Sequence, residues 1–363
     1  MSISIYREYY LNIVDGEHLD TCSKAILKAL YPFSKIYGFV VKTRIFFYKK
    51  GILKSIRLPV PVISVGNITI GGTGKTPVVE YIARYLHIKG KKVAILSRGY
   101  AANIKQENSS LNKNACNDEY LMFQENIPDI PNLLHKDRIR SGLDAIKHFQ
   151  VECLLLDDGF QHLRLSRDLD IVIIDVLNPF GYEQIVPCGM LREPLEELQR
   201  CDMIMLTHVD QCNPDNIGLI INRLNEIARD VPIVETVHRP ICLESTKNTV
   251  PLDLSCLQGK RVFAFCAIGN PVSFRKSLEG LGAEVVSFRI FPDHHMYTSS
   301  ELGKLNAEAQ RIKPDAIIIT QKDRVKVRNS PDVWDFPLWT LKMEIHIVKG
   351  HEIFENRINA ILN

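Results

Sequence analysis

Residues 60–76 read Val60-Pro61-Val62-Ile63-Ser64-Val65-Gly66-Asn67-Ile68-Thr69-Ile70-Gly71-Gly72-Thr73-Gly74-Lys75-Thr76. An apolar run typical of a buried strand passes into a glycine-rich turn, and a helical pattern begins at its end. Backbone N–H groups in such a turn, together with the helix dipole, bind nucleotide phosphates. Lys75 is expected at the β- and γ-phosphates, and the hydroxyl of Thr76 at Mg²⁺. The sequence therefore predicts a nucleotide-binding loop made of Gly71, Gly72, Thr73, Gly74, Lys75 and Thr76.

One position departs from the standard pattern G-x-x-x-x-G-K-[ST], which begins with glycine. Thr69 occupies that position here, and Gly71 and Gly72 inside the loop compensate in flexibility. The alternative interpretation is a glycine-rich turn without a ligand.

A second chemical signal follows the apolar run 153–156, which ends in Asp157-Asp158-Gly159-Phe160-Gln161-His162. Carboxylates at the carboxyl end of a parallel strand lie in the crevice where ligands bind. An acidic residue after a buried strand is also the arrangement that holds Mg²⁺ in nucleotide-binding loop proteins. The alternative is an aspartate pair that caps the next turn. His162 stays ambiguous between a packing role and a functional one.

Apolar runs and helical patterns alternate from residue 58 onward. We expect strands at 60–65, 93–96, 153–156, 171–174, 203–206, 262–265, 285–288 and 316–319, and helices at 76–89, 138–149, 213–228, 271–281 and 299–312. This alternation predicts an α/β fold of the P-loop NTPase type, with a mostly parallel sheet covered on both faces.

The domain prediction follows from these patterns. We expect an N-terminal basic amphipathic helical segment (1–57), a P-loop kinase domain (58–240) and a smaller C-terminal α/β domain (241–363). The looser stretch 236–260, with Pro240 and Pro251, is interpreted as the seam. Residues 339–347 are expected to form a terminal strand, followed by a helix.

The N-terminal segment is basic and aromatic. Residues 24–57 contain nine Lys or Arg and no Asp or Glu. We expect Pro32 and Gly38 to break or kink the helical run 24–48. The composition fits an interfacial helix pair with its apolar face in lipid and its cations on anionic head groups. The alternative is a core-packing helical hairpin with a solvated basic face.

Composition excludes several classes of protein. The 363 residues are 45% hydrophobic and 24% charged, which is typical of a globular chain. A net charge of +3 argues against bulk nucleic-acid binding. The nine cysteines form no C-x-x-C pair, so reduced thiols are expected. Neither a secretory signal nor an apolar run of the roughly 20 residues needed to span a bilayer is present.

Six segments in order resemble one family: residues 58–67, the loop through Pro77, 96–100 (Leu-Ser-Arg-Gly-Tyr), 157–162, 190–194 (Met-Leu-Arg-Glu-Pro) and 291–295 (Phe-Pro-Asp-His-His). Together they resemble the tetraacyldisaccharide 4′-kinases, over about residues 37–326. The resemblance implies Mg²⁺-dependent transfer of the γ-phosphate of ATP to the 4′-hydroxyl of tetraacyldisaccharide 1-phosphate, which gives lipid IVA in lipid A biosynthesis. It also implies a peripheral enzyme at the cytoplasmic face of the inner membrane, and it strengthens the membrane interpretation of residues 24–48.

The same resemblance implies roles for individual residues. Asp118, in Asn117-Asp118-Glu119-Tyr120, corresponds to the base for the sugar hydroxyl, and His294 to its partner. Implied metal ligands are Thr76, Asp157 or Asp158, and Glu193, while Arg192 corresponds to a residue at the phosphates. Each also has an ordinary structural interpretation: Asp118 as a helix N-cap, Arg192 and Glu193 as a surface pair, and His294 as a solvent-facing loop residue.

Two other functions stay open. Thr207-His208-Val209-Asp210 follows a buried strand and faintly resembles a guanine-reading motif, as in a GTPase or metallocentre chaperone. The second is a kinase of a soluble sugar. No protein partner is predicted.

Overall fold

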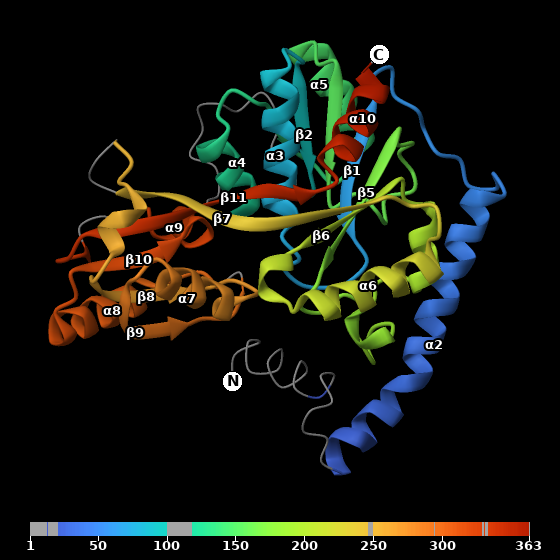
Figure 1. The fold of residues 1–363 in the computed structure, drawn as a ribbon. Helices are drawn as coiled ribbons and strands as arrows, with labels where there is room; N and C mark the ends of the chain where they lie inside the picture. Colours follow the sequence, from blue (N-terminus) through green and yellow to red (C-terminus); the bar gives the residue numbers. More distant parts are fainter. Residues whose placement is uncertain are drawn as a thin grey trace. The chain divides into compact units, whose positions relative to one another are not determined.

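The computed structural model describes residue 13 and residues 21–99, 118–245, 250–293, 295–328, 330 and 333–362. The chain divides into two compact units (Figure 1). Unit 1 comprises residues 1–108, 129–237 and 347–363, and unit 2 comprises residues 109–128 and 238–346.

Unit 1 is built on a parallel sheet. Its strand order is β3-β2-β4-β1-β5-β6-β7, and neighbouring strands pair in parallel. The strands are β1 (Val62–Asn67), β2 (Val93–Ser97), β3 (Asn132–Leu134), β4 (Cys153–Asp157), β5 (Leu169–Asp175), β6 (Met203–Thr207) and the start of β7 (Ile233–Ser245). The predicted strands of this region are confirmed, and β3 and β7 are additions.

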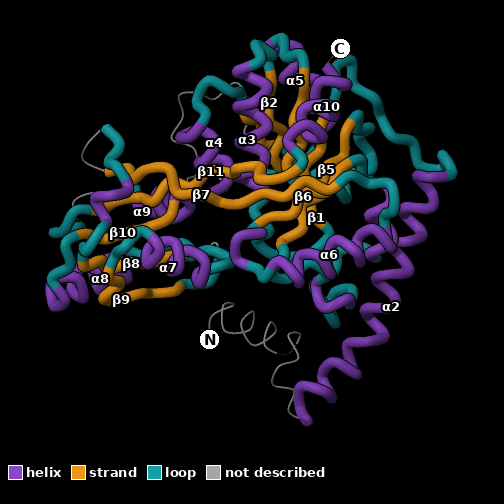
Figure 2. Tube along the Cα trace, viewed as in Figure 1, coloured by secondary structure: helices purple, strands orange, loops and turns teal. Residues whose placement is uncertain are grey.

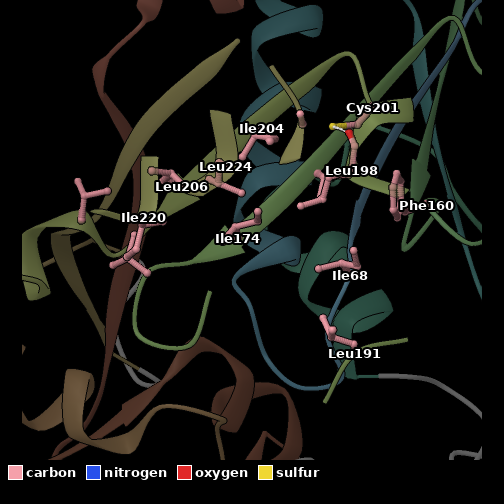
Figure 3. Packing of buried hydrophobic residues seen from close by; sticks show 14 of the residues in the cluster. Ile68, Phe160, Ile174, Leu191, Leu198, Cys201, Ile204, Leu206, Ile220 and Leu224 are labelled. Atoms are coloured by element: carbon pink, nitrogen blue, oxygen red, sulfur yellow. Dashed lines mark hydrogen bonds between the residues drawn. The ribbon is translucent and has the colours of Figure 1, made fainter. Parts of the chain in front are cut away.

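Helices bury both faces of this sheet. The helices are α3 (Lys75–Ile88), α5 (Arg138–Phe149), α6 (Pro214–Ile227) and α10 (His351–Leu362). Ile139 of α5 packs with Leu154 of β4, and Leu224 of α6 packs with Val172 of β5. Figure 3 shows Leu224 in this cluster of buried side chains. Strand register places Leu154 and Val172 on the same face, so α5 and α6 share it. The strands are almost continuously apolar because neither face meets water.

The strands of unit 2 have the order β11-β10-β8-β9, and neighbouring strands pair in parallel. Its elements are β8 (Arg261–Cys266), β9 (Glu284–Ile290), β10 (Ala316–Thr320), β11 (Leu338–Lys349), α4 (Asp118–Asn126), α7 (Pro271–Gly280), α8 (Ser299–Ile312) and α9 (Gln321–Val327). Alternate residues of β8 face opposite cores. Ala264 packs with Phe274 of α7, whereas Phe265 packs with Leu302 of α8.

The stretch interpreted as a loose seam contains the second half of a long strand. β7 runs through Pro240 to Ser245, beyond the point where unit 2 begins at His238. Leu243 of this strand pairs with Leu252 in an antiparallel bridge. The expected boundary at 240/241 lies within β7, and residues 347–363 group with unit 1. The assignment of domains to these boundaries stays a prediction.

The stretch 24–48 lies within one helix, which corrects the prediction of a helix pair in that stretch. α2 (Thr21–Lys49) continues through Pro32 and Gly38 (Figure 2). Gly38 has a packing reason, because a Cβ there would lie 3.0 Å from Cδ1 of Ile185. The hydroxyl of Ser34 donates to the carbonyl of Ile185 at 2.7 Å. Within the described part of the chain, no helix is long and apolar enough to cross a membrane.

Candidate functional site

The predicted phosphate loop connects β1 to α3 in unit 1. Gly74, directly before α3, has φ 81°, and Gly71 has φ 119°, so both positions favour glycine over any residue with a side chain. The Asn67 side-chain amide donates to the Thr69 carbonyl at 2.8 Å and to the Thr73 hydroxyl at 3.0 Å. Thr73 is buried. The glycines therefore permit the backbone conformation of the loop, and the hydrogen bonds of the Asn67 side chain stabilise it.

A second segment pairs with the loop backbone and explains why Thr69 replaces glycine. Thr69 and Leu191 form an antiparallel bridge. The backbone N–H of Ile70 donates to the carbonyl of Met190 at 2.7 Å, and the backbone N–H of Arg192 donates to the carbonyl of Ile68 at 2.8 Å. Thr69 has no positive φ, so extended pairing suits a β-branched residue there. The Met190–Pro194 motif is thus tied directly to the loop.

The carboxylate of Asp158 pairs with two cationic side chains next to the loop. One Oδ lies 3.7 Å from Nζ of Lys75, and both carboxylate oxygens accept from Nη1 of Arg192 at 3.0 Å. Nη1 of Arg192 also lies 3.3 Å from the side-chain oxygen of Gln161. Burial acts to raise the pKa of Asp158, but Lys75 and Arg192 outweigh it and hold the pKa below its usual value.

Asp157, one residue earlier, is buried at the end of β4. Its carbonyl accepts from the guanidinium of Arg138 at 2.7 Å. Arg138 is itself buried, although it opens a helix and no sequence pattern marked it. The guanidinium therefore fixes the backbone from which both aspartates project.

Glu193 is a buried carboxylate rather than half of a surface pair. Only 2% of its surface is exposed, and it accepts from Nη1 and Nη2 of Arg200 at 3.0 and 2.7 Å. Nη2 of Arg200 also donates to the carbonyl of Phe160 at 2.7 Å, and the guanidinium lies over the Phe160 ring. Burial raises the pKa of Glu193 to about 7, although Arg200 opposes the shift. Arg200 therefore joins the Asp157–His162 and Met190–Pro194 segments.

The oxygen donors of unit 1 fit a magnesium ion. Thr76, in the first turn of α3, offers a hydroxyl, and Asp157, at the end of β4, offers a carboxylate; both residues are buried. Asp158 and Glu193 offer carboxylates that already bind Arg192 and Arg200. Throughout the described residues, no three His, Cys, Asp or Glu side chains gather as a metal site.

The other predicted residues belong to unit 2. Asp118 is the first residue of α4, and its carboxylate lies 3.5 Å from Nζ of Lys326. His294 lies outside the described residues. Its neighbour Asp293 lies 3.5 Å from Nζ of Lys322. No sequence pattern marks either lysine, because each contact joins segments far apart in the chain.

A parallel sheet with a glycine-rich loop between strand and helix, an acidic pair on the neighbouring strand and converging cations defines a nucleotide-dependent phosphotransferase of the P-loop class. The profile of the tetraacyldisaccharide-1-P 4′-kinase family matches residues 26–363, and the chain belongs to this family. The resemblance inferred from the sequence is therefore confirmed.

Individual relatives support the same family assignment. The chain is 38% identical over 358 residues to tetraacyldisaccharide 4′-kinase of Syntrophus aciditrophicus, which covers 94% of each chain. It is 37% identical over 337 residues to that of Elusimicrobium minutum, with 90% of this chain and 89% of the relative covered. The crystal structure of LpxK from Aquifex aeolicus in complex with ATP is 30% identical, with a TM-score of 0.72 over 93% of this chain and 100% of that one.

Proposed function

We propose that this protein transfers the γ-phosphoryl group of ATP to the 4′-hydroxyl of tetraacyldisaccharide 1-phosphate, giving lipid IVA. Family membership supports the reaction class. The observation that carries the proposal is the convergence of Lys75 and Arg192 on Asp158 beside the phosphate loop. Phosphoryl transfer needs positioning and charge neutralisation, and these groups supply both.

In this proposal, unit 1 holds the nucleotide. Backbone N–H groups of residues 71–76 bind the phosphates, and Lys75 and Arg192 neutralise the charge that develops on them. Thr76 and Asp157, with Asp158 and Glu193, would hold magnesium, which supplies further neutralisation at the β- and γ-phosphates when bound. Arg200 keeps Glu193 and the Phe160 backbone in place.

Unit 2 supplies the proposed base. A sugar hydroxyl is a poor nucleophile, so a carboxylate must take its proton as it attacks. Asp118 accepts that proton, with His294 as its partner. The hydroxyl oxygen bonds to the γ-phosphorus, and the bond from that phosphorus to the β,γ-bridging oxygen breaks, which releases ADP. Burial of Asp118 beside Lys326 supports this role, because it fixes the carboxylate in one place.

We also propose that α2 binds the membrane that contains the acyl chains of the substrate, at the cytoplasmic face of the inner membrane. Large apolar side chains of α2 are exposed, among them Phe33 (63%), Ile36 (62%) and Phe39 (71%). Lys24, Lys28, Lys35 and Lys42 on the same helix suit anionic head groups. Without lipid, such an apolar surface would be an unfavourable exposure to water.

Transfer of ³²P from ATP to tetraacyldisaccharide 1-phosphate in detergent micelles tests the reaction. The parent protein should label the lipid, and Lys75→Ala should not. No lipid labelling by the parent refutes the proposal. Preference for GTP would support the switch alternative, and labelling of a soluble monosaccharide without detergent would support the soluble-sugar kinase.

A further inference from the structure

Two lysines lie one turn apart on α9 (Gln321–Val327) in unit 2, and each contacts a carboxylate that is largely shielded from solvent. Nζ of Lys326 lies 3.5 Å from Oδ2 of Asp118, and Nζ of Lys322 lies 3.5 Å from Oδ1 of Asp293. The Lys326 side chain is 1% exposed, and that of Asp293 is 4% exposed. Because residues four apart share a helix face, α9 presents both cations to the same side of the helix.

Burying an ammonium group in this way is unfavourable unless it is paired, so these are not ordinary surface ion pairs. Burial acts to lower the pKa of Lys322, but Asp293, Glu119 and Asp118 outweigh it and raise the pKa above its usual value. The surrounding carboxylates therefore hold Lys322 in its charged form.

The helix that bears the lysines is itself fixed. Asp323 of α9 accepts from the N–H of Ala267 at 2.9 Å, from the Tyr297 hydroxyl at 2.8 Å and from the Thr320 hydroxyl at 2.6 Å. Nζ of Lys326 lies 3.4 Å from the Ala267 carbonyl. Both lysines thus project from a helix with little freedom to move relative to β8.

The contact between α4 and α9 contains further charges. Glu125 of α4 pairs with Arg328 at 3.1 Å and with Arg324 at 3.6 Å. Within the described part of unit 2, the charged groups that face Asp118 or adjoin its partner include Lys326, Lys322 and Asp323 of α9, Glu119 of α4, and Asp293. Among these, Lys326 is the cation in contact with the Asp118 carboxylate.

We propose that Lys326 and Lys322 are positioning residues for the acceptor side of the reaction. Lys326 holds the Asp118 carboxylate ionised and in place, and Lys322 holds Asp293, the residue before His294. This inference rests on the proposed role of Asp118 as base. α9 is then a common support for two segments that are far apart in the sequence.

The effect on the pH profile has a defined sign. A cation close to a carboxylate favours its ionised form, so removing the cation raises the pKa of Asp118. Since the base must be ionised, the acid limb of kcat moves to higher pH. Loss of position should also lower the plateau kcat by about 10- to 100-fold, with KM for ATP unchanged.

The test measures kcat, KM for ATP and their pH dependence for the full-length chain in lipid–detergent micelles. Lys326→Met and Lys326→Gln should both move the acid limb, and Lys326→Arg should restore it. Lys322→Met should lower kcat with KM for ATP unchanged. Lys342→Met is the matched control: it removes a cation of similar exposure to Lys322, paired with Glu244 at 3.1 Å in the same unit, and should leave the pH profile unchanged.

The outcomes separate this inference from the proposed function. If the parent transfers phosphate and Asp118→Ala does not, but the Lys326 variants keep the parental acid limb and kcat, the positioning role is wrong. If Asp118→Ala retains full activity, the base assignment fails instead. If Lys326→Met and Lys326→Gln both fail to fold, judged by thermal unfolding and ATP binding, Lys326 is a core residue of unit 2 and the inference is overturned.

Discussion

Thr69 lies opposite Leu191 in an antiparallel bridge, so the first position of the phosphate loop is part of a two-stranded contact. The threonine that replaces the motif's first glycine therefore connects the phosphate loop to the segment that contains Arg192 and Glu193. Restoring the motif with Thr69→Gly should weaken the site. We expect a loss of about 1 kcal/mol in unfolding free energy from backbone entropy and β-propensity, and a higher KM for ATP.

Thermal unfolding and ATP titration check this prediction. Thr43→Gly, on the exposed face of α2, is a control for the general cost of glycine and should leave KM for ATP unchanged. An unchanged or lower KM for ATP in Thr69→Gly would contradict the link.

Arg192 is, with Lys75, one of the two cations that pair with Asp158 beside the phosphate loop. Arg192→Met removes the donor to both oxygens of Asp158 and, in the proposed mechanism, a charge at the transferring phosphoryl group. We expect kcat to fall by about 10²- to 10³-fold. Arg192→Lys should recover only part of the activity, because an ammonium is a point charge without the planar donor geometry. Steady-state kinetics with saturating lipid would measure both, and full activity of Arg192→Met would remove this residue from the mechanism.

His162 gives a pH-dependent stability. Burial, with repulsion from Arg138 and Arg167, lowers its pKa to about 4. The unfolded chain, with an ordinary pKa near 6.5, therefore binds more protons than the folded chain between pH 4 and about 6.5. The free energy of unfolding therefore decreases as the pH falls through this range. Between pH 7 and pH 5 we expect the parent to lose about 2 kcal/mol relative to His162→Gln, which does not titrate.

Urea unfolding at the two pH values measures this difference. His148→Gln removes an exposed histidine from α5 and serves as the control, with no expected change in the pH dependence. Equal pH dependence of parent and His162→Gln would show that His162 titrates normally.

The apolar face of α2 should determine binding to lipid. Phe33→Asp combined with Phe39→Asp removes two exposed aromatic side chains, each worth roughly 2 kcal/mol when buried in an apolar environment. We expect sedimentation with anionic liposomes to fall by at least about tenfold. Leu219→Asp, at a 66% exposed apolar position on α6, is the matched control and should sediment like the parent. Equal sedimentation of the double variant would refute the membrane role of α2.

Much of the fold was predictable because its signals are local. The apolar strand runs and the helices between them follow from periodicity, and the loop follows from a glycine pattern tied to backbone conformation. β7 was missed because Pro240 and several polar residues indicate a loop, whereas the strand passes through them to Ser245. The helix pair at the N-terminus was wrong because Pro32 does not interrupt α2.

The site was predictable only in part, for a different reason. Lys75, Thr76 and the aspartate pair have fixed spacing within motifs, but their partners do not. Arg200 pairs with Glu193 from outside the Met190–Pro194 motif. Lys326 pairs with Asp118, although the two residues are far apart in the sequence. Such contacts depend on tertiary packing, so no local pattern indicates them.

α10 (His351–Leu362) has a consequence for the order in which the chain matures. This helix is synthesised after all of unit 2, yet Phe354 is fully buried against Tyr81 and Tyr85 of α3, at ring distances of 5.5 and 5.4 Å. The Tyr85 hydroxyl also donates to Glu355 at 3.1 Å. α3 is the helix that begins at Lys75. A ribosome-bound chain that has emerged only through residue 346 therefore still lacks the packing partner of its phosphate-loop helix.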